Sequence, residues 1–204
     1  MAPVNVERIL LYAWQDRVED LKAEILEGGV LKEEVKLQKD DIGGPFLALL
    51  LKSACFHNAT SVVKFLASTV DKHMLNHHGH YRIPHSIRKY HGSALHAAVD
   101  RRSAKCLQYL LDAGADPNVT DEYGKTPLHY ASELGHIDCM RHLLDSKANP
   151  NQPDKDKRTP LHYATIENKA DCVLHLLQAG ANPDQGDKAG YGTAISIYSA
   201  NAFP

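Results

Sequence analysis

One pattern recurs along this chain at a fixed spacing of 33 residues, and that spacing constrains the fold more than any other feature. A leucine and the histidine after it recur three times, and a cysteine ten residues further on recurs with them. A fixed period of this length is typical of proteins built from stacked units, in which each unit buries its apolar face against its neighbour. The repeated positions are Leu95, Leu128 and Leu161, then His96, His129 and His162, then Cys106, Cys139 and Cys172.

The six residues TPLHYA stand at 126–131 and again at 159–164, and each letter has a physical role. Thr126 stands where a helix N-cap is needed, and Pro127 follows at the first helical position, where its missing N–H costs nothing. Leu128 is expected to face the core. A second helix follows in each unit, because IDCMRHLL and ADCVLHLL carry apolar residues at helical spacing.

Two lysines replace glycines at turn positions of the repeat. Gly180 lies just past the second helix, where a left-handed residue closes the helix end. In the middle repeat Ser146 and Lys147 replace the Ala-Gly pair, and Lys157 takes the place of Gly124. A residue other than glycine costs on the order of 1 kcal/mol in a left-handed conformation. We therefore expect the structure to be locally weakened at these two lysines.

The pattern closely resembles the ankyrin repeat over about 91–187, roughly half of the chain. That repeat consists of a turn, T-P-L-H, a short helix, a second helix and G-A-D-x-N. The resemblance implies an all-α solenoid of stacked helix–turn–helix units joined by hairpin turns. It also implies that the repeated histidine is structural, with its ring bonded to the backbone of adjoining turns.

We expect a single ankyrin-repeat domain over 1–204, with about five repeats and a truncated one. Before residue 91 the apolar spacing predicts helices at 7–15, 17–27, 46–57 and 59–68. Leu50 and Leu95 are 45 residues apart rather than 33, which places an insertion in Ser68–His91. The predicted segments are a capping repeat at 6–40, a divergent repeat at 41–88 with a long His-rich loop at 69–91, well-formed repeats at 88–120, 121–153 and 154–186, and a truncated repeat at 187–204.

The last predicted segment is apolar and lacks the polar outer face that a terminal repeat needs. We therefore expect the chain to be a fragment of a longer protein.

Composition and charge narrow the class of protein. The chain of 204 residues has a formal net charge of −2, which argues against a nucleic-acid-binding surface. The N-terminus lacks the features of a signal peptide, and no stretch approaches the roughly 18 apolar residues of a membrane helix. We expect a cytoplasmic or nuclear protein whose four cysteines are reduced thiols.

The cysteines at the repeated position are predicted to form a row of small buried side chains. Neighbouring helices pack about 8–10 Å apart, whereas a disulfide requires Cα atoms within about 7 Å. Cys55 occupies a different position, near the end of a first helix, and is predicted to be the more reactive thiol.

The His-rich loop is a candidate metal site, because imidazole is a common ligand for Zn²⁺ and Cu²⁺. It contains no cysteine and no paired spacing of the zinc-finger kind. A solvated loop and a pH-sensitive binding surface are the alternative interpretations. The candidate ligands are His73, His77, His78 and His80.

A partner is expected on the surface that the repeat leaves free, namely the hairpin tips and the exposed part of each first helix. Tyr90 and Tyr123 stand at equivalent tips, and exposed aromatic residues often dominate binding energy. Leu134 and Ile166 would extend an apolar strip beside them. The predicted partner-binding residues are Lys89, Tyr90, Asp100, Arg101, Glu122, Tyr123, Lys125, Glu133, Leu134, Lys155, Asp156, Arg158, Ile166 and Glu167.

These features predict a protein-binding module without catalytic activity and without a cofactor. No phosphate-binding glycine motif and no Ser–His–Asp set stand outside the repeat pattern. Two alternatives stay open. The chain is either the substrate-recognition or targeting part of a larger protein, such as an enzyme or a ubiquitin-ligase adaptor of the SOCS-box type, or a metal-binding protein that uses the His-rich loop.

Overall fold

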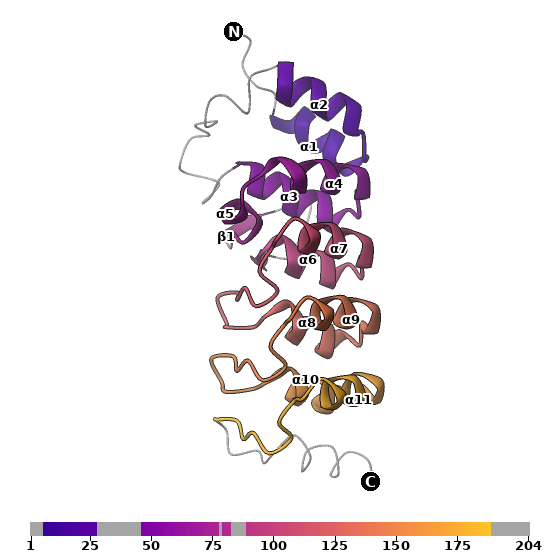
Figure 1. Ribbon diagram of the computed structural model, residues 1–204. Coiled ribbons are helices and arrows are strands. Elements are labelled where there is room, and N and C mark those ends of the chain that lie inside the picture. The colour runs from indigo at the N-terminus through magenta and orange to yellow at the C-terminus, as the bar shows by residue number, and fades with distance from the viewer. Residues whose placement is uncertain (1–5, 28–45, 78, 83–88, 189–204) are drawn as a thin grey trace. The chain divides into compact units, whose positions relative to one another are not determined.

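The computed structural model describes residues 6–27, 46–77, 79–82 and 89–188, and the chain divides into two compact units (Figure 1). The first unit is Met1–Ala115 and the second is Asp116–Pro204. Each is built mainly from pairs of short antiparallel helices, as the repeat pattern predicts.

The described residues of the first unit form three helix pairs. The inner helices pack on one another in the order α1, α3, α6, and the outer helices pack in the order α2, α4, α7. Four buried leucines of this unit are among its largest core side chains, at Leu21, Leu50, Leu66 and Leu107. The helices are α1 (Val6–Trp14), α2 (Val18–Glu27), α3 (Phe46–Phe56), α4 (Thr60–Thr69), α6 (Ala94–Asp100) and α7 (Ala104–Asp112).

The insertion between α4 and α6 is partly ordered into regular elements rather than being loop throughout. It holds a single helical turn, α5 (Lys72–Leu75), in which Leu75 is buried and which packs against α3. Two short strands follow, β1 (Gly79–Arg82) and β2 (Lys89–Gly92), paired antiparallel with Tyr81 opposite Tyr90. The predicted loop at 69–91 therefore contains a helical turn and a β-hairpin.

The described residues of the second unit form two further helix pairs. The TPLHYA sequence begins the first helix of each pair. Inner helix α8 packs against α10, and outer helix α9 packs against α11. Leu128, Met140, Leu161 and Leu176 are almost fully buried between them. The helices are α8 (Pro127–Leu134), α9 (Ile137–Asp145), α10 (Pro160–Ile166) and α11 (Ala170–Gln178).

The backbone at the turns agrees with the conformations predicted from the repeat. Gly180 has φ of 85°, and the lysines expected to be left-handed are so, with φ of 70° at Lys147 and 60° at Lys157. At Gly124, where φ is 79°, an added Cβ would lie 3.0 Å from the backbone nitrogen of Lys155. Glycine is therefore needed at that turn for space as well as for conformation.

Asparagine side chains connect successive turns of the second unit. The Asn118 carbonyl accepts a hydrogen bond of 2.7 Å from the backbone N–H of Asn149, and Asn151 accepts one of 2.6 Å from Asn182. The Asn151 amide also donates to the carbonyl of Gly180 at 3.0 Å. These bonds fix the spacing between neighbouring turns, and thereby position the hairpin tips.

Candidate partner-binding surface

The rings of the repeated histidines form hydrogen bonds with the backbone. Nδ1 of His129 accepts the backbone N–H of Thr126 at 2.9 Å, so the ring proton is on Nε2, which lies 3.1 Å from the carbonyl oxygen of Arg158. His162 makes the same Nδ1 contact with Thr159. Burial lowers the pKa of His129 to about 4, because a charged imidazolium would lose its hydration there. His129 therefore connects two turns, as the resemblance implied, whereas His162 is bonded through Nδ1 to its own turn and its Nε2 is buried without a hydrogen-bond partner among the described residues.

The cysteines are buried thiols that form no disulfide, and the prediction that Cys55 is reactive is wrong. All four are fully buried. Burial and the neighbouring thiol of Cys106 raise the pKa of Cys55 well above its usual value, whereas a reactive thiol needs a lowered pKa and access to solvent. Burial of Cys55 could not be predicted from the repeat, because Cys55 lies outside the 33-residue register.

The His-rich segment is only partly within the described residues. His73 and His77 lie close together, with ring centroids 6.1 Å apart, while His78 and the side chain of His80 fall outside the described part of the chain. Among the described residues, no three His, Cys, Asp or Glu side chains are grouped as a metal site requires.

Lys125 connects a hairpin tip of the second unit to its inner helices. Its ammonium group forms an ion pair of 2.9 Å with Glu133 and lies 4.1 Å from the ring centroid of Tyr163. Tyr163 in turn donates its hydroxyl to the buried carboxylate of Asp154 at 2.7 Å. Burial and this bond raise the pKa of Tyr163, so its hydroxyl stays protonated. These contacts therefore hold Lys125, Glu133 and Tyr163 in one arrangement.

Three apolar side chains of the same turn and inner helices are exposed. Tyr123, two residues before Lys125, is 54% exposed; Leu134, next to Glu133, is 40% exposed; Ile166 is 39% exposed. A hydrogen bond to Glu122 raises the pKa of the Tyr123 hydroxyl. Exposed apolar side chains around an ordered polar centre are typical of a protein-binding surface. We call Tyr123, Lys125, Glu133, Leu134 and Ile166 the unit 2 surface, beneath which the Tyr163 ring is buried.

The remaining predicted residues of the second unit lie around or beside this surface. Lys155, Asp156 and Glu167 are exposed, whereas Glu122 is half-buried. Arg158 is engaged in the fold, because its Nε lies 3.1 Å from a buried carboxylate oxygen of Asp187. Tyr163 was not predicted, since it belongs to the recurring TPLHYA pattern.

The predicted residues of the first unit are on β2 and at the end of α6. Lys89 and Tyr90 belong to β2, and their side chains fall outside the described residues. Asp100 is half-buried, and Arg101 is exposed. The guanidinium carbon of Arg101 lies 4.6 Å from the ring centroid of Phe56, which is a contact that the sequence did not predict.

Comparison with known families agrees with this geometry. The family model for ankyrin repeats in three copies matches residues 48–121 and 95–187, which together span more than half of the chain. No curated protein sequence matches the chain at a significant level. Within the described residues, none of the helices has the length and apolar character needed to span a membrane. From its repeat pattern, helix pairs and family match, the chain belongs to the ankyrin-repeat family, and its fold is the all-α ankyrin solenoid.

Proposed function

We propose that this chain is a protein-binding module that holds a partner on the unit 2 surface and carries out no catalysis of its own. Ankyrin repeats generally mediate protein–protein interaction. The observation that supports this site is the set of exposed apolar residues, Tyr123, Leu134 and Ile166, on the same turn and inner helices as the Lys125–Glu133 ion pair.

The arrangement suits binding because little of it has to be ordered when a partner arrives. Lys125 is held by Glu133 and by the Tyr163 ring, and the Tyr123 carbonyl accepts the N–H of Lys155 at 3.0 Å. A surface that is already ordered loses less conformational entropy on association. Tyr123 is the expected anchor, since a large aromatic side chain at the centre of an interface contributes much of the affinity.

The test places a photo-crosslinking amino acid at Tyr123, and in a second variant at Leu174. Leu174 is a matched control, because it is also 54% exposed but lies on outer helix α11. After irradiation in a cell extract, we expect discrete protein adducts at position 123 that are missing at position 174. The same adducts at both positions would mean that exposed apolar area alone captures proteins.

Two further parts of the proposal concern the context of the chain. We propose that it works in the cytoplasm or nucleus, which suits its four buried thiols that form no disulfide. A role as the recognition part of a larger protein, such as a ubiquitin-ligase adaptor, is compatible with a binding module.

A further inference from the structure

The first unit carries a row of rings in contact where its inner helices end. Trp14 and Phe56 are each two residues before a left-handed residue, Asp16 and Asn58, and so occupy equivalent places in α1 and α3. The His57 ring lies 5.1 Å from Trp14 and 5.3 Å from Phe56, centroid to centroid. We call Trp14, Phe56 and His57 the aromatic row.

Three exposed cations lie beside the aromatic row, between α6 and α7 and in the first turn of α7. Arg101 stacks on Phe56, while Arg102 and Lys105 line an open cavity of about 460 Å³ beside it. None of the three forms an ion pair with any other residue that the structure describes. We call Arg101, Arg102 and Lys105 the basic edge.

Two carboxylates at and after the α1–α2 turn are engaged elsewhere. Asp16 accepts the backbone N–H groups of Ser61 and Val62 at the start of α4, and Asp20 pairs with Arg17 at 2.8 Å. Asp100 is the one further carboxylate among the described residues of these turns, and it is half-buried. The basic edge therefore presents a net positive charge, although the chain as a whole is slightly acidic.

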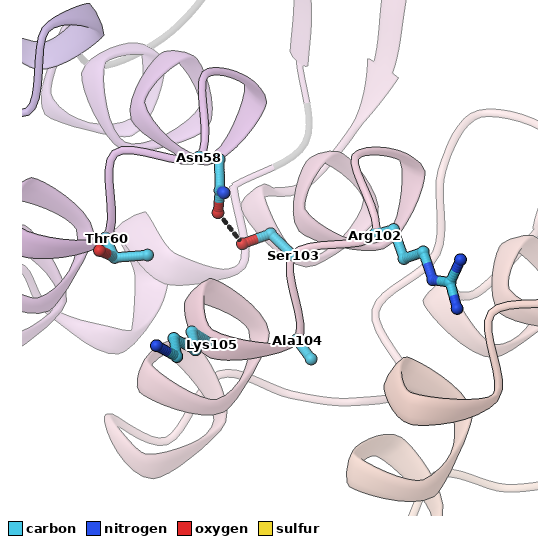
Figure 2. Close-up of a pocket in the computed structure, with 6 residues that line it drawn as sticks. All are labelled: Asn58, Thr60, Arg102, Ser103, Ala104 and Lys105. Atoms are coloured by element: carbon cyan, nitrogen blue, oxygen red, sulfur yellow. Dashed lines mark hydrogen bonds between the residues drawn. The ribbon is translucent and has the colours of Figure 1, made fainter.

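The cavity between the turns is lined by small and polar side chains. Figure 2 shows the Ser103 hydroxyl bonded to Asn58, Lys105 on the side of Thr60, and Arg102 extending away from that bond. The Ser103 hydroxyl donates to the Asn58 side-chain carbonyl, which fixes one wall. Ala104 leaves the opening free of bulk, so a small side chain of a partner has room to enter.

We infer that the basic edge and the aromatic row of the first unit form a second docking surface, for an acidic peptide segment that carries an apolar residue. Carboxylates of the peptide would pair with Arg102 and Lys105, because exposed cations without a partner attract the opposite charge. The apolar residue would lie against the aromatic row or in the cavity. This surface shares no residue with the unit 2 surface.

A protein segment suits these residues better than a nucleic acid does. Single-stranded nucleic acids bind by stacking bases on open aromatic faces. Here Arg101 covers one face of Phe56, and the His57 ring lies at only 30° to that of Trp14. Burial and the nearby Arg101 charge lower the pKa of His57, so it is a neutral ring near pH 7.

The probe is a short fluorescein-labelled peptide in which glutamates flank a single leucine, with phenylalanine and tryptophan versions beside it. In each matched control peptide, glutamine replaces every glutamate. We expect the whole chain to bind the acidic peptides more tightly than the glutamine peptides, with affinity that falls as salt is raised. Binding is measured by fluorescence anisotropy.

Charge reversal locates the site. Arg102→Glu with Lys105→Glu should weaken acidic-peptide binding by about tenfold or more. Lys147→Glu with Lys157→Glu makes the same charge change at exposed lysines of the second unit and should leave affinity within about twofold. Because Arg102 is left-handed, with φ of 53°, the single variant Lys105→Glu on α7 is measured as well and should weaken binding in the same direction.

Several results would overturn the inference. These are no acidic-peptide binding up to ~1 mM, equal binding of glutamine peptides, or unchanged affinity after charge reversal. Tighter binding of a single-stranded oligodeoxynucleotide or an anionic vesicle, lost on the same charge reversal, would assign the edge to that other partner. Tyr123→Ala with Ile166→Ala should not change peptide binding, so the result is independent of the proposed unit 2 surface.

Discussion

At the scale of single residues, His129 joins two turns, and it can do so only while its ring is neutral. Nδ1 of His129 accepts the N–H of Thr126, and its other nitrogen faces the carbonyl of Arg158. A proton added to Nδ1 would meet the Thr126 donor and would have to be buried as a charge. The position therefore couples folding to pH.

Acidification should destabilise the protein through His129. Its pKa is lowered from 6.5 to about 4 in the folded state, so its contribution is complete above pH 6.5 and is lost as the pH falls toward 4. Between pH 7 and pH 5 the free energy of unfolding should fall by about 2 kcal/mol from this group. Urea unfolding at the two pH values measures the change, and His129→Gln, although less stable, should show a smaller difference. An equal difference in the variant would show that other groups are responsible.

Lys147 is a second residue whose conformation has a measurable cost. Its φ of 70° is unfavourable for any side chain, and the equivalent position is Gly180 in the next repeat. Lys147→Gly should raise the free energy of unfolding by about 1 kcal/mol in a urea titration. Lys155→Gly is the control, because Lys155 is also exposed but does not have a positive φ, and it should give no gain.

At the scale of elements, the turn of one helix pair caps a helix of the next. Asp16 stands between α1 and α2, and its carboxylate accepts the N–H of Val62 at 2.9 Å and the hydroxyl of Ser61 at 2.9 Å. The backbone N–H of Ser61 also donates to this carboxylate. Without Asp16, the N–H groups of Ser61 and Val62 in the first turn of α4 would have no protein acceptor. The side chain thus fixes the packing of α2 on α4 as well as the start of the helix.

Removing this cap should destabilise the first unit. Asp16→Ala should cost about 1 kcal/mol, since it deletes a helix cap and places alanine at a φ of 55°. Asp20→Ala removes only an exposed ion pair with Arg17, and should cost less than about 0.5 kcal/mol. Equal effects of the two changes on urea unfolding would be inconsistent with a capping role for Asp16.

The helices and turns that follow the 33-residue spacing could be predicted from the sequence. The parts of the chain that do not follow this spacing could be predicted only in part. The helices of the second unit and the left-handed lysines were predicted, because each position has two equivalents elsewhere. Asp16 and Asn58 are 42 residues apart, so no register connected them, and neither the cap nor the aromatic row was predicted. Exposure at Tyr123, Leu134 and Ile166 agrees with the predicted apolar strip, whereas the burial of Cys55 depends on packing that the sequence does not show.

At the scale of the whole molecule, the recurring residues hold the fold and the variable residues face solvent. Leu128 has no exposed surface, whereas Leu174 on α11, where the two preceding repeats have Gln108 and Arg141, is 54% exposed. Leu128→Ala should destabilise the second unit by roughly 2–5 kcal/mol, and Leu174→Ala by no more than about 0.5 kcal/mol. Thermal or urea unfolding of the whole chain distinguishes the two, and similar losses would show that burial does not separate the two classes.

The central claim is that the unit 2 surface binds a partner. It is tested most directly by measuring how tightly variants of the chain bind the protein that is crosslinked at position 123. Tyr123→Ala with Ile166→Ala is compared with Leu174→Ala and Leu177→Ala, a pair with nearly the same exposed fractions. We expect the first pair to lower the affinity by about a hundredfold without a change in the unfolding midpoint, as loss of an aromatic anchor does. The second pair should bind like the unaltered chain. Equal affinity of both pairs would contradict the claim.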